Sequence, residues 1–422
     1  MDKTRILVFS SAAISNEESN GRVLKNLLPS FDSNSFMNIY IYGKPMNSSD
    51  VEYHNFTDKN ALISFLTLGI CSKENKISFD SAADENQGNK RAISRSSFHY
   101  FLRNIVWKFA FGIKNKILKV SKKYKPNVIL LLGANFAFFY KTATLVAKKT
   151  NAKLVIYTAE DYPLKKYNYM DGKVDNNIFS RSVQKSLFSA AKKAHLFSAA
   201  CVYNSEKLMN DYIASGIGNI GCSSIIRIPS ALSRVKSHAD NGIILYAGNL
   251  PESRCRSLLE FADCLEKINT NHFVSVYGNI YSDEYGEKIC KHPKIKYCGV
   301  VDYEKLISIF NNASFLLHIE GFDDYTLLDY KHAFSTKIAD YLMLGIPFIC
   351  YGSNQIAGIE YLQNLNFDFT IISKKSLCES LDKILNGSVE YRWDEKQIVD
   401  EFSIDSNKEK MSKIIGQVCT RE

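Results

Sequence analysis

A lysine stands in the first turn of a short predicted helix, the end of a helix at which a positive charge is unfavourable. Ser335 is a typical N-cap residue and Gly345 a typical stop, so the sequence predicts a helix over residues 336–344. The aligned peptide dipoles make the beginning of this helix partially positive, and Lys337 is unfavourable there unless an anion binds beside it. Free backbone N–H groups, the hydroxyl groups of Ser335 and Thr336 and the Lys337 ammonium group together favour a phosphate or a diphosphate.

An acidic residue follows one turn later on the same side of this helix. Asp340 can accept hydrogen bonds from vicinal hydroxyl groups, such as those of a ribose. The apolar run 346–352 predicts a strand, which would place the helix at a sheet edge where open α/β sheets bind ligands. Alternatively, Lys337 and Asp340 form an ion pair on a solvated face. The apolar flanks of the segment favour the ligand interpretation.

A second cation, Arg254, stands at the start of another predicted helix, just after a Gly-Asn turn. This position favours contact with an anion, although a surface residue that caps the helix is the alternative. No Asp-x-Asp sequence occurs in the chain, so we expect neither Mg²⁺ nor Mn²⁺ and no other cofactor.

Two adjacent carboxylates, Glu160 and Asp161, end a predicted strand and are the candidates for catalysis. Either can orient or deprotonate a substrate hydroxyl group. Because neighbouring side chains of a strand point to opposite faces, at most one of the two is expected to reach a substrate directly. The alternative for each is a cap on the turn that begins at Pro163.

The elements that must position these residues alternate regularly along the chain. Apolar, β-rich runs are followed by segments with helical periodicity, and this pattern occurs twice, before about residue 230 and again from residue 242. Uninterrupted apolar strands between helices are typical of parallel sheets covered on both faces. A chain of 422 residues also exceeds what one hydrophobic core usually serves. We therefore predict an α/β protein with two Rossmann-like, doubly wound parallel-sheet domains at residues 1–235 and 242–390, and a helical tail at 391–422 that returns to the first domain.

A long basic segment lies in the first predicted domain. Residues 86–159 contain 15 Lys and Arg residues and no Asp or Glu. Within it, the segment 90–125 interleaves aromatic residues with lysines, which is typical of a helix on an anionic membrane surface. The alternative is a helix that covers the next strand with its lysines in solvent, and the two interpretations are compatible. Nucleic acid is not expected as a partner, because the aromatic residues follow a helical pattern and form no stacking platform on a sheet.

No apolar run reaches the length of a membrane span, and the first residues lead straight into a strand-like run. We therefore expect a cytoplasmic protein with peripheral contact to the inner face of the cytoplasmic membrane. The ten cysteines are scattered without a CxxC pair, which predicts free thiols.

The segment 334–352, FSTKIADYLMLGIPFICYG, resembles the donor-binding segment of GT-B-fold glycosyltransferases, in which a lysine precedes an acidic residue and a Gly-x-Pro strand. Residues 242–268, GIILYAGNLPESRCRSLLEFADCLEKI, and 295–322, IKYCGVVDYEKLISIFNNASFLLHIEGF, are similar to other sections of the donor domain. ESNGRVLKNLL at 18–28 and VIYTAEDYPLKKY at 155–167 resemble the first half of bacterial polysaccharide-forming members. The resemblance implies two domains facing across a cleft, with the acceptor domain first and the donor domain second.

The resemblance also implies roles for individual residues. Asp340 stands where the family holds the donor ribose, and Lys337 and Arg254 stand where cations meet the diphosphate. The family's usual pair of glutamates eight positions apart is replaced here by His332 and Asp340, and Glu320 is the candidate for the lost acid. The implied donor-binding set is Arg254, Val300, Val301, Glu320, Ser335, Thr336, Lys337 and Asp340, with the two valines at the nucleobase; the acceptor-side loop contains Gly21 and Arg22, and the catalytic candidates are Glu160 and Asp161.

By the same resemblance, the protein is expected to move one hexosyl or N-acetylhexosaminyl residue from a nucleotide-diphosphate sugar, with retention of configuration. The expected acceptor is a growing surface polysaccharide or a lipid-linked oligosaccharide, such as capsule, O-antigen or exopolysaccharide. Two alternatives stay open: a nucleotide-sugar epimerase of the same fold, and a non-catalytic protein that binds a nucleotide sugar.

Overall fold

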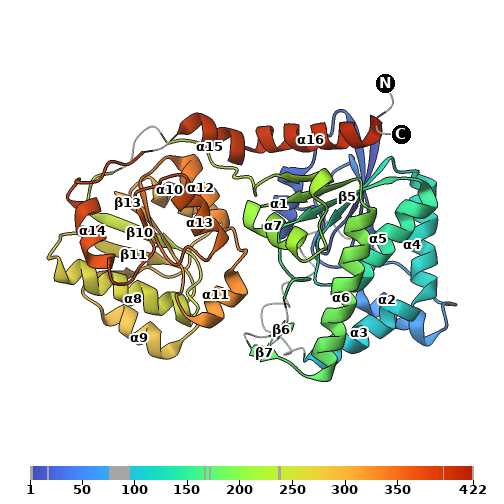
Figure 1. The fold of residues 1–422 in the computed structure, drawn as a ribbon, viewed down its shortest axis with the longest axis horizontal. Helices are drawn as coiled ribbons and strands as arrows, with labels where there is room; N and C mark the ends of the chain where they lie inside the picture. Colours follow the sequence, from blue (N-terminus) through green and yellow to red (C-terminus); the bar gives the residue numbers. More distant parts are fainter. Residues whose placement is uncertain are drawn as a thin grey trace. The chain divides into compact units, whose positions relative to one another are not determined.

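The computed structural model describes residues 3–16, 19–75, 96–165, 168–170, 173–235, 239–392 and 394–420. Of the basic segment 90–125, residues 90–95 lie outside the described residues. The chain divides into two compact units, one formed by Met1–Arg227 with Ile404–Glu422 and the other by Ile228–Ser403 (Figure 1).

Strands and helices alternate in both units, as the sequence predicts. The strands are β1 (Thr4–Phe9), β2 (Asn34–Tyr40), β3 (Val51–Asn55), β4 (Val128–Leu132), β5 (Lys153–Thr158), β6 (Asn168–Met170), β7 (Lys173–Asp175), β8 (Ala200–Tyr203), β9 (Ser223–Ile225), β10 (Ile243–Ala247), β11 (Phe273–Tyr277), β12 (Ile295–Tyr297), β13 (Phe315–Ile319), β14 (Phe348–Tyr351) and β15 (Thr370–Ile371). The helices are α1 (Ser19–Leu27), α2 (Asp58–Leu66), α3 (Ser97–Phe109), α4 (Phe111–Tyr124), α5 (Ala137–Thr150), α6 (Ile178–Phe197), α7 (Glu206–Ala214), α8 (Glu252–Lys267), α9 (Asp283–Lys291), α10 (Tyr303–Phe310), α11 (Asp324–Tyr330), α12 (Thr336–Leu344), α13 (Ala357–Asn364), α14 (Leu377–Leu385), α15 (Glu395–Phe402) and α16 (Ile404–Thr420).

Each unit is built on a parallel sheet. The first sheet has the strand order β3-β2-β1-β4-β5-β8-β9, and the second has the order β12-β11-β10-β13-β14-β15. Strand β4, with the sequence VILLL, is almost wholly buried, because helices cover both faces of its sheet. The strand order reverses between β1 and β4 and between β10 and β13, and such switch points are where open α/β sheets bind ligands. The predicted fold class is confirmed.

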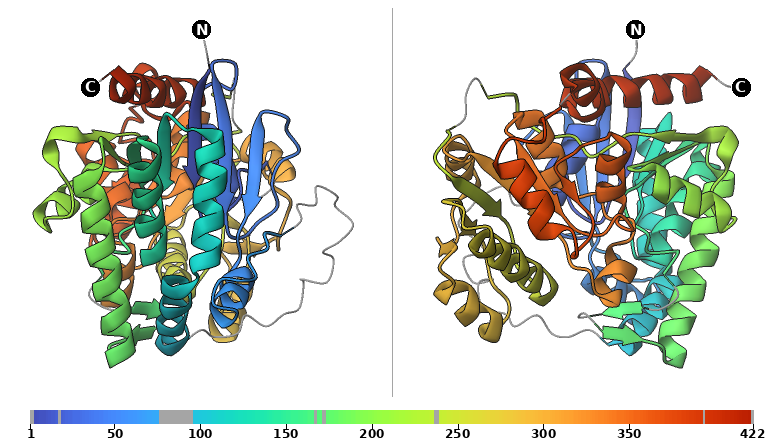
Figure 2. Two further views of the ribbon diagram at one scale, coloured as in Figure 1. Left: turned by 90° about the vertical axis from the view of Figure 1, so that its right-hand side faces the viewer. Right: turned by 60° about the vertical axis from the view of Figure 1, so that its left-hand side comes forward.

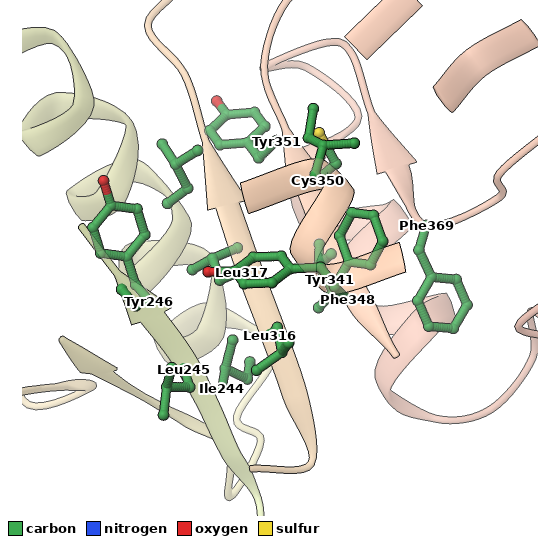
Figure 3. Packing of buried hydrophobic residues seen from close by; sticks show 14 of the residues in the cluster. Ile244, Leu245, Tyr246, Leu316, Leu317, Tyr341, Phe348, Cys350, Tyr351 and Phe369 are labelled. Atoms are coloured by element: carbon green, nitrogen blue, oxygen red, sulfur yellow. The ribbon is translucent and has the colours of Figure 1, made fainter. Parts of the chain in front are cut away.

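Apolar side chains form separate cores in the two units. In the first unit, α4, α5 and α6 cover one face of the sheet, and α1 and α16 cover the other (Figure 2). In the second unit, residues of β10, β13 and β14 pack against α12, where the Tyr341 ring lies 5.6 Å from the Phe348 ring between their centroids (Figure 3). These cores fix the positions of the loops at the strand ends.

The limits of the two units differ from the predicted domain limits at residues 235 and 391. The segment after Arg227 belongs to the second unit because its backbone is hydrogen-bonded to that unit. The Ser230 N–H donates to the Phe402 carbonyl group over 2.9 Å. The predicted tail divides between the units. Helix α15 buries Phe402 in the second core, whereas α16 buries its apolar side in the first.

A disulfide bond joins Cys264 of α8 to Cys378 of α14 in the second unit. The expectation of free thiols is wrong for this pair. The two residues are 114 positions apart in the sequence, but packing of the two helices brings their Cα atoms within 5.0 Å, a separation that a disulfide can span.

Candidate functional site

The helix with the unfavourably placed lysine forms as the sequence predicts. Helix α12 begins after Ser335, whose Oγ accepts a hydrogen bond from the Lys337 N–H over 3.3 Å. It ends at Gly345, which has the left-handed φ of 67° that a C-cap glycine favours. Thr336 is exposed and Ser335 is half-buried, so buried packing does not block the first turn of the helix.

The Lys337 side chain folds back against the end of β10. Its Nζ lies 4.6 Å from the centroid of the Tyr246 ring, a cation–π distance. A Cβ atom added at Gly248 would lie 2.1 Å from this Nζ, so only glycine leaves the space that the ammonium group occupies. Burial, and to a smaller extent the Arg254 charge, lower the pKa of Lys337 to about 7, although Glu320 opposes the change. Lys337 is therefore a cation whose charge depends on an anion close by.

An ion pair lies beside this lysine. Arg254, near the start of α8, donates from Nε to Glu320 Oε2 over 2.9 Å and from Nη2 to Glu320 Oε1 over 2.8 Å. Glu320 directly follows β13 and is buried. Burial alone would raise the pKa of Glu320, but the Arg254 guanidinium together with the neighbouring His318 and Lys337 outweighs it and holds the pKa below its ordinary value. The two residues predicted to bind the donor thus bind each other in a fixed geometry.

A buried histidine completes the group. His318 Nε2 lies 3.4 Å from Glu320 Oε1, and burial lowers the pKa of His318 to about 3, which keeps the ring neutral. In the described part of the chain, His318 Nδ1 has no hydrogen-bond partner. Gly248 is not among the residues predicted from the sequence, although it lies just after the end of a predicted strand.

Asp340 is positioned from a distant part of the second unit. The Ser230 hydroxyl group donates to Asp340 Oδ1 over 2.5 Å, although the two residues are 110 positions apart. Asp340 is half-buried on the second turn of α12. Its carboxylate therefore has a fixed orientation.

These residues meet at the switch point of the second sheet. Gly248 follows β10, Glu320 follows β13, and α12 leads into β14. Val300, which is exposed, and Val301 follow β12 at the same edge, but the sheet order places β11 between β12 and β10. The structure thus brings together Arg254, Glu320, Lys337 and the first turn of α12, and leaves the two valines at one side.

The predicted acceptor-side residues lie in the first unit, after β1 and β5. Glu160 is exposed, whereas Asp161 is buried and lies 3.5 Å from Lys165 Nζ. Gly21 is in α1, where an added Cβ would lie 2.6 Å from the Ala13 carbonyl oxygen, so this helix needs glycine to approach the loop after β1. Arg22 beside it is half-buried.

The described part of the basic segment forms α3 and α4. Trp107 is buried and stacks on Phe138, with ring centroids 4.1 Å apart, and Ile113 and Ile117 enter the same core. The alternative of helices that cover the sheet is therefore confirmed, while membrane contact stays a prediction. Across the described residues, no helix has both the length and the apolar character that a membrane crossing needs.

One group of described residues has the geometry to hold a metal ion. Ligand atoms of Asp263, Glu266 and His292 lie within 4.8 Å of one another on α8 and at the end of α9. His292 Nε2 is 3.1 Å from Asp263 Oδ1, so the two side chains also satisfy each other directly. Neither the switch-point residues nor the first turn of α12 contributes to this group.

No protein-family model matches the sequence, and no curated protein matches it. Solved structures match over the full length. HepE of Anabaena, crystallised with UDP, is 10% identical with a TM-score of 0.63 over 98% of this chain and 100% of that chain. The lipopolysaccharide outer core galactosyltransferase WaaB is 13% identical with a TM-score of 0.60 over 98% and 99% of the two chains, and a Rickettsia africae glycosyltransferase is 14% identical with a TM-score of 0.58 over 100% of both. The chain therefore has the GT-B fold, and its resemblance to GT-B-fold glycosyltransferases is confirmed at the level of that fold.

Proposed function

We propose that the protein is a glycosyltransferase that moves one hexosyl or N-acetylhexosaminyl residue from a nucleotide-diphosphate sugar, with retention of configuration. The proposed acceptor is a growing surface polysaccharide or a lipid-linked oligosaccharide of the capsule, O-antigen or exopolysaccharide type. The observation that carries the proposal is Lys337, a half-buried lysine with a pKa of about 7 in the first turn of α12 at a sheet switch point. The names of the similar structures, HepE with UDP and the galactosyltransferase WaaB, support this class of substrate.

The charges around Lys337 suit a diphosphate. Arg254 and Glu320 neutralise each other, and His318 is neutral, so the Lys337 ammonium group and the N-terminus of α12 provide the local positive charge. A bound diphosphate would raise the pKa of Lys337 and make the lysine a full cation. The same groups would stabilise the negative charge that grows on the nucleoside diphosphate as it leaves, and no step requires a metal ion.

The remaining roles follow the sequence assignments. Ser335 and Thr336 would donate to the diphosphate, Asp340 would accept from the ribose, and the backbone of Val300 and Val301 would contact the nucleobase. In the first unit, Gly21 and Arg22 would face the reaction centre. Glu160 or Asp161 would orient or deprotonate the acceptor hydroxyl group.

A lipid-linked acceptor requires contact with a membrane, and the first unit has a suitable surface. Large apolar side chains are exposed at the end of α2 and at the junction of α3 and α4, and we call them the apolar tip: Leu66, Leu68, Ile70, Phe109 and Phe111. Leu68 and Ile70 are each 87% exposed. A Cβ added at Gly69 would lie 3.1 Å from the Gly112 nitrogen, so the turn after α2 and the start of α4 are in close contact.

Lysines accompany the apolar tip. Lys108 Nζ lies 5.2 Å from the centroid of the Phe109 ring, and Lys114 Nζ lies 5.5 Å from that of the Phe111 ring. Burial and the charges of Lys141 and Lys108 lower the pKa of Lys114. Apolar side chains at the centre and cations around them favour the headgroup region of an anionic bilayer, and we propose that the protein docks on the inner face of the cytoplasmic membrane in this way.

The reaction is tested by incubating the protein with a panel of sugar nucleotides and measuring nucleoside diphosphate release with and without membrane extract. We expect release from one sugar nucleotide, and only when the extract supplies an acceptor. Release that does not depend on the extract would favour the epimerase or a hydrolase, and absence of release with measurable binding would favour the non-catalytic binding protein.

Membrane docking is tested separately by cosedimentation with vesicles of phosphatidylglycerol and phosphatidylcholine. We expect the variant Leu68→Asp/Ile70→Asp to lose at least about tenfold in vesicle affinity, because two charged groups replace apolar side chains that enter the bilayer. Ile220→Asp, at another exposed apolar residue of the first unit, is the control and should bind as the original protein does. Equal binding by all three proteins would contradict docking through the tip.

A further inference from the structure

A basic hollow lies at the amino-terminal edge of the first sheet, opposite the edge where the loops after β1 and β5 contain the predicted acceptor-side residues. Its volume is about 520 Å³. Five cations line it: Arg5, Lys122, Lys125, Lys149 and Lys153. Its lining residues include no Asp and no Glu in the described part of the chain.

The start of three neighbouring strands forms the floor of this hollow. The Arg5 N–H donates to Asn127 Oδ1 and the Asn127 N–H to the Arg5 carbonyl group, each over 2.8 Å. The Lys153 N–H donates to the Asn127 carbonyl group over 3.0 Å. Cys419 of α16 closes one side. The backbone ladder of the sheet therefore fixes where Arg5 and Lys153 enter the hollow.

The ends of two helices provide the other three cations. Lys122 lies in the last turn of α4, Lys149 lies in the last turn of α5, and Lys125 is the C-cap of α4 with a left-handed φ of 53°. Cations are favourable at a helix C-terminus, so the helix dipole alone is enough to explain lysines at these three positions. Arg5 and Lys153 come from strands β1 and β5.

The arginine is held in place at the hollow. Arg5 Nε donates to the Lys125 carbonyl group over 2.7 Å, which orients the guanidinium group and ties β1 to the end of α4. An oriented guanidinium group beside several ammonium groups is the donor set that binds phosphate oxygens. The five positive side chains repel one another. A single anion with several negative charges would reduce the repulsion among all of them.

We propose that the basic hollow binds a compact anion that carries several phosphate groups, at a site separate from the proposed donor site. The volume lies in the range of small-molecule pockets, which favours a compact ligand over a long polymer. Inorganic polyphosphates and nucleoside triphosphates share this chemistry. The inference stands on the first unit alone and does not depend on the proposed transferase activity.

The test is isothermal titration calorimetry of the full-length protein with sodium tripolyphosphate, ATP and orthophosphate. We expect saturable binding of tripolyphosphate at least about tenfold tighter than that of orthophosphate, because affinity grows with the number of phosphate groups that meet cations. Equal affinity for tripolyphosphate and ATP would indicate that the phosphate chain alone is recognised. Tighter binding of ATP would indicate a nucleoside triphosphate.

The matched variants locate the site. Lys122→Gln/Lys149→Gln/Lys153→Gln should weaken tripolyphosphate binding at least about tenfold. The control, Lys59→Gln/Lys119→Gln/Lys185→Gln, removes the same charge from exposed positions on α2, α4 and α6, and should stay within about twofold of the original affinity.

Thermal unfolding without anion separates binding from folding. The hollow variant should melt within about 2 °C of the original protein or above it, because the repulsion among its lysines has been reduced. Equal weakening of tripolyphosphate binding in both variants, no saturable binding by the original protein, or binding of orthophosphate as tight as that of tripolyphosphate would overturn the proposal.

Discussion

The carboxyl edges of the two sheets have the same strand order at their switch points, but they treat charge differently. In the second unit, Arg254 and Glu320 form a largely buried ion pair, and Lys337 lies beside them with a lowered pKa. In the first unit, Glu160 is exposed and Asp161 is buried next to a lysine. The Asp161–Lys165 pair is about as little exposed as the Arg254–Glu320 pair, so the two edges differ in the additional cation Lys337 and not in the burial of an ion pair. The proposed donor role of the second edge rests on this additional cation, which a bound diphosphate would hold in its charged form.

The largest expected effect comes from removing Lys337, the cation that distinguishes the second edge from the first. Lys337→Ala removes the cation proposed to neutralise the leaving diphosphate, and we expect nucleoside diphosphate release to fall by about 10²–10³-fold. Circular dichroism should show an unchanged fold. Lys375→Ala, at an exposed lysine of the same unit, should keep its activity. Unchanged kinetics for Lys337→Ala would remove this residue from the site.

The free energy of unfolding tests how strongly the Arg254–Glu320 ion pair is desolvated. Glu320→Ala leaves the Arg254 guanidinium without its partner, and we expect the free energy of unfolding to fall by about 3 kcal/mol in urea titrations. Lys374→Ala breaks the more exposed pair with Glu260, for which we expect less than about 1 kcal/mol. Similar losses in both variants would mean that the Arg254–Glu320 pair is no more desolvated than a surface pair.

The position of the lysine is tested without removing its charge. Gly248→Ala places a Cβ where Lys337 Nζ lies, at a backbone φ of +143° that other residues rarely adopt. We expect activity to fall by about tenfold, because a displaced cation loses part of its interaction with the diphosphate. The loss should be smaller than that of Lys337→Ala, and full activity would show that the ammonium group need not occupy this space.

The smallest expected effect is on the pH dependence of stability. The folded pKa of Lys337, about 7, lies below the unfolded value of 10.5, so the unfolded chain binds more protons between these two pH values. Lys337 therefore lowers the free energy of unfolding by its full amount below pH 7, and this loss becomes smaller as the pH rises above 7. Relative to Lys337→Met, the original protein should gain at most about 1 kcal/mol of unfolding free energy between pH 7 and 8. A flat difference would mean that Lys337 titrates normally.

Local sequence signals determined much of the fold and the first turn of the site. Ser335 and Gly345 delimit α12 because capping depends on hydrogen bonds within a few residues. The alternation of apolar strands and helices indicated two parallel sheets because burial on both faces leaves a continuous apolar pattern. Both signals act over a short stretch of chain.

Only the tertiary structure decided which side chains meet. Arg254 and Glu320 are 66 positions apart, and Ser230 and Asp340 are 110 positions apart, yet each pair is hydrogen-bonded. The basic hollow likewise gathers cations from β1, β5 and the ends of two helices. No local pattern specifies such meetings, because they depend on which strands are neighbours and how far each helix extends, and both are set by packing of the whole unit.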